Sequence, residues 1–164
     1  MNNPRHHGTD SHAPVDRAAL RQSLEATRTA FHRLLESVVA DRWLKKSPAS
    51  AWTVREVLVH LTWALEQLPE EVAQARQGRG MFNLPAWFAD PASYWLICWI
   101  ARKATPDSVR RRYDAATAAA IAALEAVPDS DWLLGAEFYG HGFHTVADLF
   151  QGPARHLEEH TVGM

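Results

Sequence analysis

Two histidines stand four residues apart near the end of the sequence, His156 and His160 in the segment GPARHLEEHTVGM. In a helix this spacing places both imidazoles on one face, where they can bind the same metal ion. The pair alone is a weak signal, because two histidines fall at this spacing by chance in many helices. Whether a third ligand can reach them depends on the elements that the rest of the chain forms.

Apolar residues recur at three-and-four spacing in four segments, which predicts four amphipathic helices. They span residues 16–39, 53–77, 106–127 and a last segment from residue 145 through residue 160. Three of them open with capping signatures, namely Thr53-x-x-Glu56, Thr105-Pro106 and Thr145-x-x-Asp148. The connection between the second and third helices is long and aromatic, and its Asp90-Pro91 pair predicts a short extra helix from Pro91 to about Lys103. No strand pairing is predicted.

These helices predict an all-α fold, a four-helix bundle with a long aromatic-rich crossover between its second and third helices. Short links make the first two and the last two helices antiparallel neighbours, whereas the crossover lets the second and third run parallel, which gives an up-down-down-up order. Residues 15–164 are expected to form this single domain, after a flexible tail over residues 1–14. Proline predicts a kink at Pro69 and at Gly152-Pro153, and the second kink would change the aim of His156.

The directions of the helices bring a third histidine to the pair. His60 lies two turns inside the helix that starts after Thr53, and an antiparallel last helix places His156 and His160 at about the same level. Three neutral imidazoles bind zinc, nickel or iron and leave an open position for water or substrate. The residues alone leave an alternative open, in which His60 is a half-exposed boundary residue and the pair lies on a frayed helix end.

Other polar residues near the three histidines have simpler explanations. Glu158 and Glu159 fall on the outer face of the last helix and are expected in solvent. Glu56 lies one turn before His60, where it could orient that ring or transfer a proton, although its capping box already explains it. Three further histidines are expected at structural or loop positions: His32, His141 and His144.

The order of these features resembles the DinB-like four-helix-bundle metalloprotein superfamily, which includes mycothiol-dependent maleylpyruvate isomerase N-terminal and bacillithiol transferase domains. The resemblance rests on WTVREVLVHL around His60, the long crossover, RHLEEH in the last helix and a length near 160 residues, and it covers the chain after the tail. It implies an up-down-down-up bundle. It also implies metal ligands from one histidine of the second helix and a His-x-x-x-His pair of the fourth, which here are His60, His156 and His160.

Aromatic side chains are expected around the open end of this site, where the first connection, the end of the crossover and the start of the third helix meet. The candidate pocket residues are Trp43, Trp52, Trp95, Trp99 and Arg102, with Arg42 as a further nearby cation. An apolar pocket with few charges suits a small organic ligand or a thiol. The clustered aromatics of the crossover equally suit a homodimer contact.

The composition limits the possible partners. A formal charge of −2 gives no field that would recruit nucleic acid or an anionic membrane, and the run Arg110 to Arg112 is expected to be the solvated start of a helix. The apolar run YWLICWIA is far shorter than the roughly 20 residues that cross a bilayer. The single cysteine, Cys98, fits a reducing cytoplasm and is expected to be a small core residue with a raised pKa.

The function that these features favour is a metal-dependent enzyme acting on a small electrophilic substrate. It would add a low-molecular-weight thiol such as mycothiol to that substrate, or isomerise such an adduct, with bound metal lowering the pKa of the thiol. Two alternatives stay open. One is a hydrolase in which metal-activated water is the nucleophile, and the other is a non-catalytic ligand-binding or stress-related bundle with a structural metal.

Overall fold

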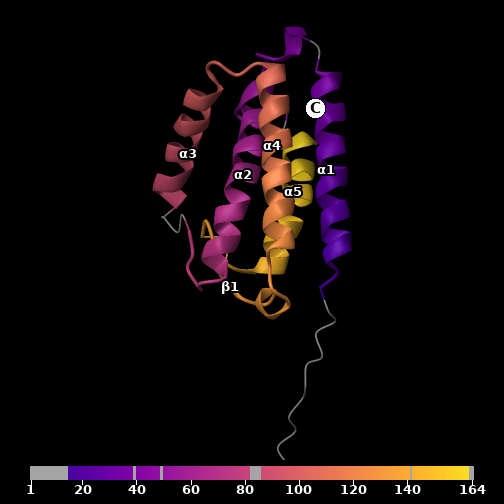
Figure 1. Ribbon diagram of the computed structural model, residues 1–164. Coiled ribbons are helices and arrows are strands. Elements are labelled where there is room, and N and C mark those ends of the chain that lie inside the picture. Colours follow the sequence, from indigo (N-terminus) through magenta and orange to yellow (C-terminus); the bar gives the residue numbers. More distant parts are fainter. Residues whose placement is uncertain (1–14, 39, 49, 82–85, 141, 163–164) are drawn as a thin grey trace, which may run out of the picture.

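Helices build most of the protein, as the computed structural model shows (Figure 1). It describes residues 15–38, 40–48, 50–81, 86–140 and 142–162, with the backbone alone for residues 86–93. The tail predicted over residues 1–14 and the loop histidine His141 therefore lie outside the described residues. The elements are α1 (Arg17–Ser37), η1 (Ala40–Arg42), α2 (Val54–Ala75), α3 (Ala86–Ala101), α4 (Pro106–Glu125), η2 (Asp129–Asp131), β1 (Gly135–Glu137), β2 (Phe143–Thr145) and α5 (Val146–Thr161).

Four long helices, α1, α2, α4 and α5, pack together, and α3 lies outside them against α2 (Figure 1). Arg110 near the start of α4 pairs with Glu36 near the end of α1 at 3.2 Å, so these two helices are antiparallel. Arg76 at the end of α2 pairs with Asp131 just after α4 at 2.7 Å, so α2 and α4 run in the same direction. His60 near the start of α2 contacts His156 near the end of α5, so these two parts of the helices lie at one end of the bundle.

The apolar positions predicted from the sequence face the core in all four bundle helices. Buried members are Leu20, Leu24, Phe31 and Leu35 of α1, Val54, Val57, Leu58, Leu61, Leu65 and Leu68 of α2, Val109, Tyr113, Ala116, Ala120 and Leu124 of α4, and Val146, Leu149, Phe150 and Leu157 of α5. Each fully buried large side chain contributes about 1.5–3 kcal/mol. The rings of Phe31 and Tyr113 stack with centroids 3.7 Å apart, because the small residues of α4 let α1 approach closely.

Capping residues fix the first residues of the helices that carry the histidines. The Thr53 hydroxyl accepts from the backbone N–H of Glu56 at 3.3 Å, and the Glu56 carboxylate accepts from the N–H of Thr53 at 2.8 Å. Thr145 and Asp148 form the same reciprocal pair at the start of α5. Such a cap contributes about 1 kcal/mol. Both predicted capping boxes are confirmed, and they set the depth of each histidine along its helix.

The extra helix of the crossover begins earlier than the sequence predicts. α3 starts at Ala86, so Asp90 lies within the helix and is not its N-cap, and Pro91 is not its first residue. A proline removes one backbone donor but does not prevent a helix from forming on both sides of it. The same holds for α2 and α5, which continue as single helices through Pro69 and Pro153.

A short antiparallel hairpin, β1 and β2, precedes α5, although no strand pairing is predicted from the sequence. His144, expected in a loop, lies in β2 opposite Ala136. A Cβ on Gly135 would lie 2.3 Å from the carbonyl oxygen of His144, so glycine is required where the strands approach. Strands of three residues are too short to show the alternation by which a strand is recognised.

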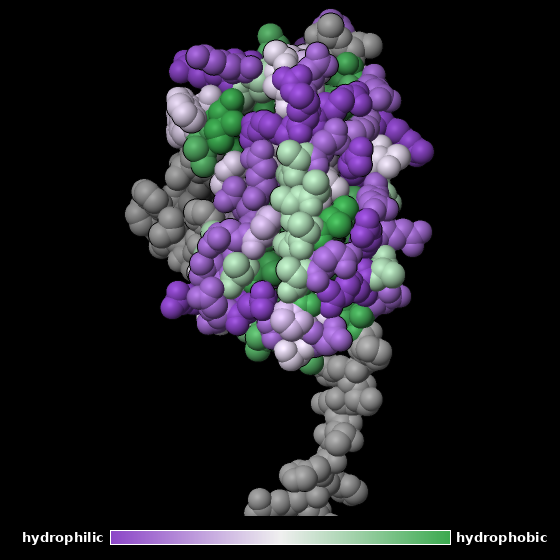
Figure 2. All heavy atoms as spheres, viewed as in Figure 1, coloured by the Kyte–Doolittle hydropathy of each residue, from purple (hydrophilic) through white to green (hydrophobic). Residues whose placement is uncertain are grey.

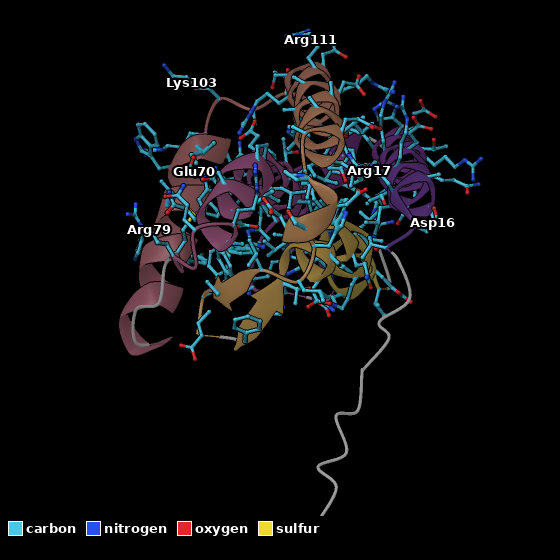
Figure 3. All side chains as sticks on the ribbon, turned by 60° about the horizontal axis from the view of Figure 1, so that its bottom comes forward. Asp16, Arg17, Glu70, Arg79, Lys103 and Arg111 are labelled. Atoms are coloured by element: carbon cyan, nitrogen blue, oxygen red, sulfur yellow. The ribbon has the colours of Figure 1, made fainter. Side chains whose placement is uncertain are left out.

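The face drawn in Figure 2 is largely hydrophilic, and a mildly hydrophobic stripe runs along α4, which carries exposed alanines such as Ala115, Ala118 and Ala122. Arg111 extends outward from the bundle (Figure 3), and its neighbour Arg112 pairs with Glu66 at 2.8 Å. The arginine run lies near the start of α4, as predicted, with Arg111 exposed and with Arg110 and Arg112 half-buried in ion pairs. None of the helices in the described part of the chain combines the length and the apolar character needed to cross a membrane.

Candidate metal centre

His60, His156 and His160 come together at the end of the bundle where α2 begins and α5 ends. The ring nitrogens that they could offer to a metal all lie within 4.8 Å of one another. The Nε2 atoms of His60 and His156 are 3.0 Å apart, and His160 lies with its ring centroid 5.0 Å from that of His60 and 4.7 Å from that of His156. The structure thus brings together the three histidines that were singled out from the sequence.

The course of α5 explains why both of its histidines face α2. The helix runs from Val146 to Thr161 through Gly152 and Pro153, so His156 and His160 stay one turn apart on one face. The aim of His156, which a kink at Gly152-Pro153 was expected to change, is directly at His60. Glu158 and Glu159 are exposed, as predicted.

Burial keeps these imidazoles neutral. It lowers the pKa of His60 to about 3, with the charges of His156 and His160 as smaller causes, and it lowers the pKa of His156 to about 4. The pKa of His160 is also lowered by burial, against the opposing effect of Glu159. At neutral pH each ring therefore keeps an unprotonated nitrogen that can bind a cation.

The donor set fits a divalent transition metal. With Zn–N bonds of 2.0–2.1 Å, tetrahedral ligation separates two ligand nitrogens by about 3.3 Å. The Nε2 atoms of His60 and His156, at 3.0 Å, are close to that separation already. Two such nitrogens facing each other need either one shared proton or a cation between them, and three imidazoles are typical zinc, nickel or iron ligands.

The second nitrogen of His60, Nδ1, is buried and has no hydrogen-bond partner among the described residues. Metal-binding histidines usually donate this N–H to a carboxylate or a carbonyl. Glu56, which the sequence offered for that role, instead accepts from the Thr53 hydroxyl at 2.9 Å as part of the capping box. The orientation of His60 therefore depends on what packs against its ring.

Trp52 is the aromatic residue that packs there. Its ring centroid lies 4.6 Å from that of His60 and 6.2 Å from that of His160. The ring of Tyr94 from α3 also packs against Trp52, with the two ring centroids 6.2 Å apart and the two ring planes at 12°. Tyr94 was not singled out from the sequence, because the way α3 packs on α2 does not follow from its apolar pattern.

Comparison with known families identifies the group to which the chain is related. The family model of the DinB superfamily matches residues 23–162. The chain belongs to the DinB superfamily. No curated protein matches the sequence significantly. Among solved structures, this DinB-superfamily protein is similar to a mycothiol-dependent maleylpyruvate isomerase, with a TM-score of 0.72 and 15% identity over 90% of this chain. At that identity the likeness shows the fold, and the chain spans 60% of the isomerase's length.

The other expected pocket residues of this DinB-superfamily protein differ from one another in burial. Trp43 is half-buried and packs against the core. Trp95 and Trp99 are 71% and 69% exposed on α3, and Arg102 is exposed just after it. Among the described residues, Trp52 is the one predicted tryptophan whose ring packs against the histidine cluster.

Proposed function

We propose that this DinB-superfamily protein is a metal-dependent enzyme that uses a low-molecular-weight thiol, in an S-transferase or isomerase reaction, on a small electrophilic substrate. The observation that carries the proposal is the convergence of three neutral imidazoles from α2 and α5. Zinc, nickel and iron are the metals that such ligands suit. The thiol is proposed because the similar solved structure is named as a mycothiol-dependent enzyme.

In this proposal His60, His156 and His160 hold the metal, and their burial prevents protons from competing for the ring nitrogens at neutral pH. A divalent ion held there would lower the pKa of a bound thiol and keep the thiolate beside the electrophile. Trp52 covers one side of His60 and limits the access of water to it. The thiol-dependent reaction also implies a reducing compartment, such as the cytoplasm, which suits the single cysteine.

The test is turnover of a panel of electrophiles by the tag-free protein loaded with Zn²⁺, Ni²⁺ or Fe²⁺, with and without mycothiol. We expect product only when metal and thiol are both present, and a loss of at least about 100-fold in His60→Ala. His144→Ala is the matched control, since it removes a half-buried histidine at the opposite end of the bundle.

Two results would change the assignment. Turnover without any thiol would favour metal-activated water as the nucleophile. A tag-free protein that binds no metal, or a His60→Ala variant with wild-type thiol transfer, would overturn the proposal.

A further inference from the structure

We infer that Tyr94 of α3 is a positioning residue for the histidine cluster and acts through Trp52. The inference deepens the proposed function, because it assigns a role at the same site. It starts from the ring contacts that run from His60 and His160 to Trp52 and on to Tyr94. These contacts connect three separate parts of the chain, namely α2 with the segment before it, α3 and the end of α5.

The indole of Trp52 is held by packing rather than by a hydrogen bond. Its Nε1 is buried and has no partner within the described part of the chain. A buried tryptophan N–H usually finds an acceptor, which then fixes the ring. The backbone of Trp52 is fixed, since its carbonyl accepts from the N–H of Ser47 at 2.9 Å. The angle of the indole itself must therefore depend on the rings beside it.

Tyr94 is the ring on the outer side of the indole, and its plane lies at 12° to that of Trp52. The two rings are therefore stacked, so each limits the tilt of the other. Burial and the nearby Glu56 raise the pKa of Cys98, as the sequence predicted, although the residue is half-buried rather than in the core.

α3 carries Tyr94 to its place beside Trp52. It packs chiefly against α2 (Figure 1), and among its described side chains Ile97 and Ala101 are the ones that are buried. Trp95 and Trp99 face solvent. Tyr94 is the described α3 side chain whose ring stacks on Trp52, so α3 acts on the indole through this ring.

Loss of the Tyr94 ring should release Trp52 and, through it, the ring of His60. An aromatic pair of this kind is worth enough to change an equilibrium roughly threefold to tenfold. We therefore expect Tyr94→Ala to bind Zn²⁺ roughly threefold to tenfold more weakly than the wild type. Tyr94→Phe keeps the ring and should retain nearly wild-type affinity.

The experiment follows the indole N–H resonance of Trp52 by ¹H–¹⁵N NMR in metal-free protein, assigned by its loss in Trp52→Phe, and Zn²⁺ affinity by titration. Tyr94→Ala should shift this resonance and speed its exchange with water, whereas Tyr94→Phe should not. Trp99→Ala is the matched control, because it removes an exposed ring from the same helix. Tyr94→Leu, which keeps apolar volume, replaces the alanine variant if that variant does not fold.

Wild-type resonance and affinity in Tyr94→Ala would overturn the inference. A Tyr94→Phe variant that behaves like Tyr94→Ala would also overturn it, because loss of the hydroxyl alone would then have the effect that is assigned to the ring. If the wild-type protein binds no Zn²⁺, the proposed function fails, and the indole resonance still decides whether Tyr94 positions Trp52.

Discussion

At the end of the bundle that carries the hairpin, polar side chains are bonded to other groups of the chain, whereas at the histidine end several are not. The Arg17 guanidinium donates to the carbonyl of Val127 and to Asp129, at 2.8 and 3.0 Å, and lies over the Trp132 ring. In the same region the Tyr139 hydroxyl donates to the buried carboxylate of Glu71. These contacts join the carboxyl-terminal parts of α2 and α4 to neighbouring segments.

The histidine end has the opposite character. Trp52 Nε1, Arg55 Nε and His60 Nδ1 are buried and have no hydrogen-bond partner among the described residues. Each buried polar group left without a partner costs about 1–3 kcal/mol. The hairpin end therefore contributes more to stability through its buried polar groups than the histidine end, where these three groups have no partner in the described part of the chain.

Metal affinity is expected to show the largest difference between variants at the two ends. His156→Ala removes one of three converging imidazoles, so Zn²⁺ affinity should fall by at least about 100-fold. Tyr139→Phe changes the hairpin end and should leave Zn²⁺ affinity unchanged. Calorimetric titration of the tag-free proteins measures both. Equal affinity in wild type and His156→Ala would mean that the histidine end is not a metal site.

The pH dependence of stability should also separate the ends. The pKa values of His60 and His156 are lowered to about 3 and about 4, from about 6.5 in an unfolded chain. Below pH 6.5 the unfolded state therefore binds protons that the folded state does not. The stability that these neutral rings contribute is present above pH 6.5 and is lost as the pH falls from there toward 4.

Urea unfolding of the metal-free protein should show a loss of roughly 3 kcal/mol between pH 6.5 and pH 5, when both rings are counted. The double variant His60→Gln, His156→Gln should have a flatter profile. Glu71, whose pKa is raised by burial, acts with the opposite sign, since its contribution is lost as the pH rises. It is present in both proteins, so their difference isolates the histidines, and parallel profiles would contradict this account.

The helices and the grouping of the three histidines could be predicted from the sequence, and the reason is periodicity. The apolar stripes and the capping boxes at Thr53 and Thr145 depend on residues within a few positions of each other, so they set the helices and the level of each histidine. His60, His156 and His160 could be grouped from helix direction and family resemblance. Their mutual approach follows from helix geometry rather than from fine side-chain packing.

The features that were missed depend on contacts between distant segments. Tyr94 reaches Trp52 because α3 begins at Ala86 and packs on α2, and no local pattern specifies that packing. The pairing of Tyr139 with Glu71 is similar, since it joins a loop residue to a helix residue far away in sequence. Tyr139 has a positive φ of 54°, a conformation that is uncommon for tyrosine and that the sequence does not predict.

Loss of the pairing between Tyr139 and Glu71 has the smallest expected effect. It measures how much the hairpin end stabilises the fold. Glu71 is 8% exposed, and burial raises its pKa while the Tyr139 hydrogen bond acts to lower it. Tyr139→Phe removes the donor from a buried carboxylate, so the free energy of unfolding should fall by about 1–2 kcal/mol at pH 7. Tyr94→Phe is the matched control, because it removes a hydroxyl from a ring that is 36% exposed, and its loss should change stability by about 0.5 kcal/mol or less. Urea unfolding measures both, and equal losses at the two positions would mean that the hairpin end has no special part in stabilising the fold.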